Sequence, residues 1–107
     1  ELVEQGRFDG PELDDYLPAL FLPFRYCSVE YIVLGCTHYP FVREAIRKNF
    51  GRPVSIIDGS EGTARQLRRQ LGARGLLRTG NTSGRITFLN SDPAKLSLCQ
   101  TLFSREY

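Results

Sequence analysis

The 107-residue sequence predicts an α/β fold with a mainly parallel sheet. Short apolar, β-branched runs at residues 31–34, 54–57 and 85–90 are typical of strands, and segments with helical spacing of apolar residues separate them. Alternation of strands with helices favours parallel pairing, because a parallel connection needs a crossover long enough to hold a helix. The composition, 41% hydrophobic and 24% charged, is that of an ordinary globular protein.

The first predicted helix covers residues 11–21, and Pro18 is expected to kink it or end it early. Its apolar residues at helical spacing are Leu13, Tyr16, Leu17 and Leu20. The strand at residues 31–34 follows, bounded by Gly35. Because its four residues are all apolar, we expect it to be buried on both faces of the sheet.

A second helix is predicted for residues 40–49, with Pro40 near its first position and Gly51 beyond its end. One side of this helix is apolar and holds Phe41, Ala45 and Ile46. The helix directly follows the strand at residues 31–34, so Cys36 is expected to lie on a strand-to-helix turn.

The strand-and-helix order then repeats. The strand at residues 54–57 leads into a helix that runs to Leu71, with Ser60 as its expected cap. The inward side of this helix is predicted to carry Ala64, Leu67 and Leu71. Residues 72–84 are rich in glycine and are expected to form an exposed loop.

Residues 85–90 are predicted as a third strand, and Pro93 opens a last helix that Ser91 or Asp92 caps. The residues of this helix available for packing are Leu96, Leu98, Leu102 and Phe103.

The charge balance predicts no polyanionic partner. Fourteen Lys and Arg against twelve Asp and Glu give a formal charge of +2, which is too small to attract nucleic acid or an anionic membrane. The arginines between residues 65 and 78 are interpreted as a solvated helix face and loop. No apolar run approaches the ~20 residues that span a bilayer.

The cysteines Cys27, Cys36 and Cys99 are odd in number and lack the spacing of a metal site. Reduced thiols in a cytoplasmic protein are therefore expected, with no metal and no disulfide framework. A secretory leader is absent from the residues given, and residues 35–40 lack the glycine spacing of a nucleotide-binding loop. The sequence contains no Met and begins at Glu1, so we expect it to be a fragment of a longer protein.

Cys36 is the candidate reactive group. The carboxyl end of a parallel strand is where open α/β sheets bind ligands, and the amides of a following helix favour a thiolate. The only histidine, His38, is two residues away and is placed to hold charge near the sulfur or to relay a proton. The residues alone leave a second interpretation open, in which Cys36 is a buried and inert cysteine.

Residues 33–40, Val-Leu-Gly-Cys-Thr-His-Tyr-Pro, resemble the signature around the second catalytic cysteine of glutamate racemases. Residues 2–6, 58–64 and 88–93 are similar to other segments of that family, so the resemblance covers essentially the whole chain. It is weakest in the glycine-rich loop.

The resemblance implies the parallel-sheet aspartate/glutamate racemase fold, in which two α/β domains face each other across a cleft. The chain would be an incomplete C-terminal fragment of this two-domain enzyme. Residues 1–60 would form part of the second, inserted domain and carry the Cys36 motif. Residues 61–107 would return to complete the first domain.

The resemblance also implies cofactor-independent interconversion of L- and D-glutamate, which supplies D-glutamate for peptidoglycan. In this family one cysteine removes the α-proton and another delivers a proton from the opposite side. Cys36 corresponds to the acid/base for the L-enantiomer, Thr37 to a substrate-binding threonine and His38 to the histidine that assists the cysteine. Glu4 matches the acidic residue that orients this histidine.

The sequence departs from the family in one large respect, because it lacks the Asp-Ser-Gly and Cys-Asn-Thr segments that supply the first cysteine. Neither Cys27 nor Cys99 has a matching context. The fragment is therefore expected to be inactive alone and to need the missing N-terminal half of the same enzyme as its partner. Without that half it is expected to expose apolar surface and to aggregate or swap. The sequence does not decide whether the enzyme is a homodimer.

Two alternatives remain. The first is a related aspartate-type racemase, which shares a Gly-Cys-Thr motif but resembles a pattern with an acidic residue in place of His38. The second is a catalytically silent α/β binding module in which Cys36 only packs. A thiol hydrolase has no support beyond the turn itself.

Overall fold

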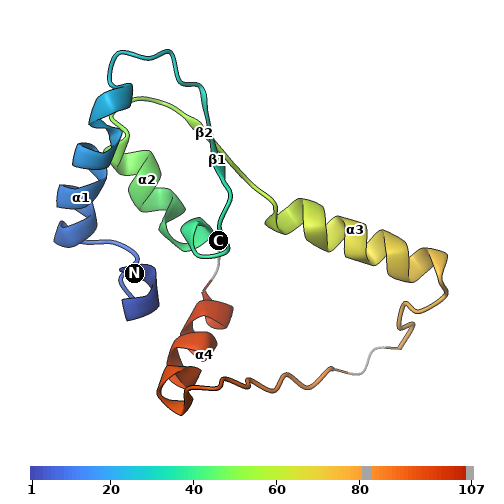
Figure 1. The fold of residues 1–107 in the computed structure, drawn as a ribbon. Helices are drawn as coiled ribbons and strands as arrows, with labels where there is room; N and C mark the ends of the chain where they lie inside the picture. Colours follow the sequence, from blue (N-terminus) through green and yellow to red (C-terminus); the bar gives the residue numbers. More distant parts are fainter. Residues whose placement is uncertain (81–82, 106–107) are drawn as a thin grey trace.

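A computed structural model describes residues 1–80 and 83–105. The two strands are β1 (Tyr31–Leu34) and β2 (Ser55–Asp58). The α-helices are α1 (Pro11–Phe21), α2 (Arg43–Asn49), α3 (Ser60–Ala73) and α4 (Leu96–Ser104). Single 3-10 turns are η1 (Val3–Gln5), η2 (Leu22–Phe24), η3 (Tyr39–Val42) and η4 (Pro93–Lys95). The predicted α/β class is confirmed, and Figure 1 shows the arrangement.

The sheet consists of β1 and β2, which pair in parallel as predicted. Tyr31 lies opposite Ser55 at one end of the pair, and Leu34 lies opposite Asp58 at the other. The connection between the strands runs through η3 and α2, which form the crossover that parallel pairing requires. Both strands therefore end at the same edge, and the turn after Leu34 leaves from this edge.

The hydrophobic core lies on one face of the sheet, between it and the helices α1 and α2. Its buried residues are Val3, Phe8, Leu13, Leu17, Leu34, Val42, Ala45 and Ile46. From the sheet, Ile32 and Ile56 pack against this core, and from α4 Leu98 and Leu102 do the same. The buried residues of the described chain thus come from its first half, and α4 adds partly buried residues at the margin of the core.

The other face of the sheet is open, so the prediction that β1 is buried on both faces is wrong. Tyr31 is 62% exposed and Val33 is 71% exposed, and Ile57 of β2 is 48% exposed on the same face. Side chains alternate between the two faces of a strand, and the core covers only the face that carries Ile32 and Leu34.

The helix α1 has the predicted bounds, but it does not end early at Pro18, which lies inside it. The chain continues directly into η2, and the backbone of Phe21 and Leu22 at this junction stays in the right-handed helical region. Leu13 and Leu17 are buried, whereas Tyr16 is 57% exposed and Leu20 is 49% exposed. The core-facing stripe of α1 is therefore narrower than the apolar spacing predicts.

The helix α3 lies apart from the other elements (Figure 1), and the predicted inward side is wrong for this chain. None of its residues is buried, and Leu67 is 59% exposed. The Cα radius of gyration is 17.6 Å, against about 13 Å expected for a compact domain of this length. The chain therefore does not close into one globule.

Aspartate side chains accept backbone amides near the start of α3 and at the start of η4, the 3-10 turn that leads into α4. Ser60 does not cap α3 as predicted; instead its amide donates to Asp58 Oδ1 at 2.8 Å. The cap predicted before the last helix is confirmed, because Asp92 Oδ1 accepts a hydrogen bond from the amide of Ala94 at 3.1 Å. In both places the shorter acidic side chain reaches an amide that has no partner within its own helix.

The predicted third strand at residues 85–90 does not form. Ile86 is 59% exposed and Leu89 is 88% exposed, and the segment runs as extended chain without a strand beside it. A strand needs a neighbour for its backbone groups, and the described residues provide none there. In the predicted glycine-rich loop, α3 takes the first two residues, Asn81 and Thr82 lie outside the described residues, and the remainder is exposed.

Across residues 1–80 and 83–105, no helix has the length and apolar character needed to cross a membrane.

Candidate active site

Cys36 lies on the turn between β1 and η3, as predicted, with its side chain half-buried. The backbone amide of His38 donates to Cys36 Sγ at 3.5 Å. The ring of His38 approaches the same sulfur, with 3.7 Å between Sγ and Nδ1. The Cys36 sulfur thus accepts one hydrogen bond from a backbone amide and faces an imidazole nitrogen, a group that can act in proton transfer.

Buried residues anchor the turn at both ends. Leu34, the last residue of β1, is 7% exposed. On the other side, Pro40 and Val42 of η3 are buried, and the amide of Phe41 donates to the His38 carbonyl at 3.2 Å. The polar residues of the turn therefore project from a segment whose apolar residues are fixed in the core.

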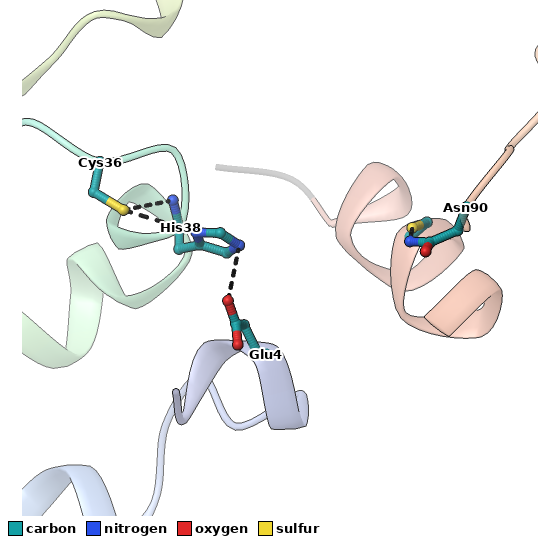
Figure 2. A network of polar contacts seen from close by, with 5 residues as sticks. Glu4, Cys36, His38 and Asn90 are labelled. Atoms are coloured by element: carbon teal, nitrogen blue, oxygen red, sulfur yellow. Dashed lines mark hydrogen bonds and ion pairs between the residues drawn. The ribbon is translucent and has the colours of Figure 1, made fainter. Parts of the chain in front are cut away.

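Glu4 lies in η1, near the N-terminus, and its side chain reaches His38. Val3, its neighbour, is 6% exposed and fixes this turn against the core. Figure 2 shows Glu4 pointing at the outer nitrogen of the ring, with 3.9 Å between Oε1 and Nε2. Both side chains are about half exposed, so water screens the pair and its main effect is orientation of the ring.

Three of the four predicted site residues thus form one line, Glu4, His38 and Cys36, and the fourth lies beside it. Thr37 stands between the cysteine and the histidine in the chain, and it is exposed. Its proposed contact with a substrate stays a prediction. The catalytic and binding roles of all four stay predictions.

The other two cysteines lack this setting. Cys27 is exposed before β1, and Cys99 lies in α4, where its sulfur accepts from Asn90 Nδ2 at 3.5 Å (Figure 2). Since His38 is the only histidine in the sequence, neither can have an imidazole partner from this chain.

One feature of the site was missed from the sequence. Asp58 ends β2 at the same edge as Cys36 and forms an ion pair with Arg43, the first residue of α2. The side chain of Asp58 is only 5% exposed. In the sequence, the only sign of this role is a charged residue at the end of an apolar run. The pairing of β1 with β2 is what shows that Asp58 lies beside the Cys36 turn.

No family model matches the chain. The glutamate racemase of Clostridium botulinum strain Alaska E43 is 41% identical over 92 residues, which cover 86% of this chain and 36% of that protein. The glutamate racemase of strain Langeland is 41% identical over 106 residues, covering 97% of this chain and 41% of that protein.

Two solved structures are also similar. Glutamate racemase from Thermus thermophilus, in complex with beta-chloro-D-alanine, gives a TM-score of 0.62 at 33% identity, covering 94% of this chain and 39% of that one. Glutamate racemase isoform RacE1 from Bacillus anthracis gives a TM-score of 0.51 at 33% identity, covering 62% of this chain and 25% of that one.

Fold and site together define an α/β protein with a cysteine–histidine pair at the carboxyl end of a parallel strand. The similar sequences and the similar solved structures all carry the same name. The chain belongs to the glutamate racemase family. It spans about two fifths of the length of the curated relatives it matches.

Proposed function

We propose that this chain supplies one of the two acid/base cysteines of a cofactor-independent glutamate racemase, and that this cysteine is Cys36. The observation that carries the proposal is the line from Glu4 through His38 to the Cys36 sulfur at the sheet edge. The relatives named glutamate racemase support glutamate as the substrate. In the cell, the product D-glutamate would serve peptidoglycan synthesis.

The proposed step is a proton exchange at the α-carbon of glutamate. The Cys36 thiolate takes the α-proton of the L-enantiomer, and a second thiol on the opposite face donates its own proton to the carbanion. The configuration is inverted, and the two cysteines have exchanged protonation states. In the reverse direction Cys36 is the proton donor.

The neighbours of Cys36 have separate roles in this proposal. His38, with Nδ1 at 3.7 Å from the sulfur, stabilises the thiolate and assists proton transfer. Glu4 holds the ring in that orientation from its outer nitrogen. Thr37, exposed on the same turn, is the candidate for binding polar groups of the substrate.

The second cysteine would come from the missing N-terminal half of the same enzyme, which is the proposed partner. Residues 1–60 would then belong to one α/β domain and residues 61–107 to the other. In the described chain the buried residues lie before residue 47 and α3 has none, which supports this division. A cytoplasmic location is part of the proposal, and a homodimer is a prediction to be tested by light scattering of the intact enzyme.

The test is racemisation of D- and L-glutamate followed by circular dichroism. The chain is assayed alone and after extension by the N-terminal half of a family member, each with Cys36→Ser as control. Activity only in the extended protein, lost on the substitution, is the expected result. Activity in the isolated chain would show that a second acid/base lies within it. A folded extended protein that racemises neither enantiomer of glutamate would overturn the proposal. Racemisation of aspartate instead would favour the related aspartate-type racemase.

A further inference from the structure

One carboxylate, that of Asp58, lies at the point where three segments meet beside the Cys36 turn. Asp58 is the last residue of β2, and its backbone pairs with Leu34, the last residue of β1. The turn with Cys36 begins at the next residue after Leu34. Backbone pairing therefore places Asp58 next to the start of this turn.

The side chain of Asp58 reaches the other end of the same turn. It forms an ion pair with Arg43, the residue at which η3 passes into α2. Its Oδ1 also accepts a hydrogen bond from the amide of Ser60 at 2.8 Å, which fixes the start of α3. The segment 35–42 thus leaves the sheet beside Asp58 and ends at a residue that is bound to Asp58.

Burial distinguishes this pair from its neighbours. The side chains of Asp58 and Arg43 are 5% and 28% exposed, whereas those of the pair Arg47–Glu44 on the same helix are 47% and 78% exposed. A buried pair is little screened by water, and loss of one partner leaves the other charge uncompensated. The ion pair therefore constrains the two ends of the Cys36 turn more strongly than a surface pair could.

We propose that Asp58 and Arg43 are positioning residues for Cys36: their ion pair holds the turn in the geometry that brings the His38 amide and ring to the sulfur. The catalytic meaning of this role rests on the proposed function of Cys36. The role itself is a property of the turn, and it is measured without any racemisation.

The first measurement is residue-resolved amide hydrogen exchange by NMR on the extended protein, because the isolated chain is expected to self-associate. Arg43→Met removes the ion pair but leaves the bond between Asp58 and Ser60, and Arg47→Met is the matched control on the same helix. In Arg43→Met the amides of His38 and Phe41 should exchange about tenfold faster, while amides of α1 stay within about twofold. In Arg47→Met both sets should stay unchanged.

Arg43→Lys is the milder variant, to be measured if Arg43→Met does not fold. It keeps the positive charge but loses the planar fork of the guanidinium, so an acceleration of about threefold is expected at the turn. Equal acceleration in α1 and in the turn, in either variant, would overturn the proposal, because it would show a role in global stability only. An unchanged turn would overturn it as well.

The second measurement is the alkylation rate of Cys36 with iodoacetamide, read by mass spectrometry. The parent carries Cys27→Ser, because trypsin leaves Cys27 and Cys36 in one peptide, between Arg25 and Arg43. For the Arg43→Met variant, where this cleavage site is lost, the peptide extends to Arg47. We expect the rate at Cys36 to fall about fivefold as the sulfur loses the His38 amide and ring contacts that the proposal assigns to the thiolate, with Cys99 unchanged as the internal reference. An unchanged or faster rate at Cys36, or a parallel fall at Cys99, would count against positioning.

Discussion

Lys48 of α2 reaches Asp14 of α1, with 2.7 Å between its Nζ and the Oδ2 of the carboxylate. The side-chain amide of Asn49 donates to the other oxygen, Oδ1, at 2.8 Å. These two hydrogen bonds, from Lys48 first and then from Asn49, lower the pKa of Asp14 from its ordinary value. The two helices that enclose the core are thus joined through one carboxylate.

The stability of the chain should therefore depend on pH through Asp14. A carboxyl group with a lowered pKa in the folded state stabilises the fold above its unfolded pKa, about 3.9, and this contribution is lost as the pH falls through the folded value. Urea unfolding at neutral and acid pH should show a smaller loss on acidification in Asp14→Asn than in the parent. Asp15→Asn, at the exposed neighbour, should keep the parental pH dependence. An identical pH profile for the parent and Asp14→Asn would contradict this.

Removal of the Glu4 carboxylate should slow racemisation without weakening substrate binding. In the extended protein, Glu4→Gln should lower kcat about tenfold, because the His38 ring loses its partner, and should leave KM nearly unchanged. Glu12→Gln is the control, since Glu12 pairs with Arg7 on the surface. A rise in KM at constant kcat would instead assign Glu4 to substrate binding.

Truncation of the core should be costly at Leu17 and cheap at Leu67. Leu17 is 5% exposed between α1 and the rest of the core, so Leu17→Ala should lower the free energy of unfolding by about 2–5 kcal/mol. Leu67 is 59% exposed on α3, so Leu67→Ala should change it by no more than about 0.5 kcal/mol. Urea denaturation followed by circular dichroism gives both values. Similar losses at the two sites would mean that α3 packs in solution.

The open face of the sheet should make the isolated chain self-associate. Tyr31, Val33 and Ile57 form an apolar face on a sheet with two strands, and both strand edges lack a neighbour in the described chain. Light scattering should show concentration-dependent association, and Val33→Lys should reduce it. A parent chain that is a monodisperse monomer with one cooperative melting transition would contradict this expectation.

The local parts of the fold were predictable because they depend on nearby residues. Strand β1, the turn with Cys36 and the following helix come from an uninterrupted apolar run, a glycine and a proline within about twenty residues. The parallel pairing of β1 with β2 also follows from their separation by one helix. The prediction of Glu4 as a site residue depends on the resemblance of residues 2–6 to the family, because no local pattern could have placed it near His38.

The failures concern apolar positions whose burial needs a contact that the described chain does not supply. Tyr31, Val33 and Leu67 are apolar at positions that suit burial, and the structure leaves them exposed. Residues 85–90 have the composition of a strand but no neighbouring strand to pair with. The spacing of apolar residues predicts which side of a segment suits burial. Whether that side is buried also depends on whether a complementary surface is present.

The stability of the helix α3 also depends on whether a complementary surface covers it. It has 14 residues and buries none of them, and isolated helices of about 12–15 residues are only marginally populated in water. Its ion pair between Glu61 and Arg65 adds little, and Gly62 lies in its first turn. The helix of residues 60–73 therefore lacks the burial from which helices in proteins gain most of their stability, and a surface that packs against it would supply this missing stabilisation.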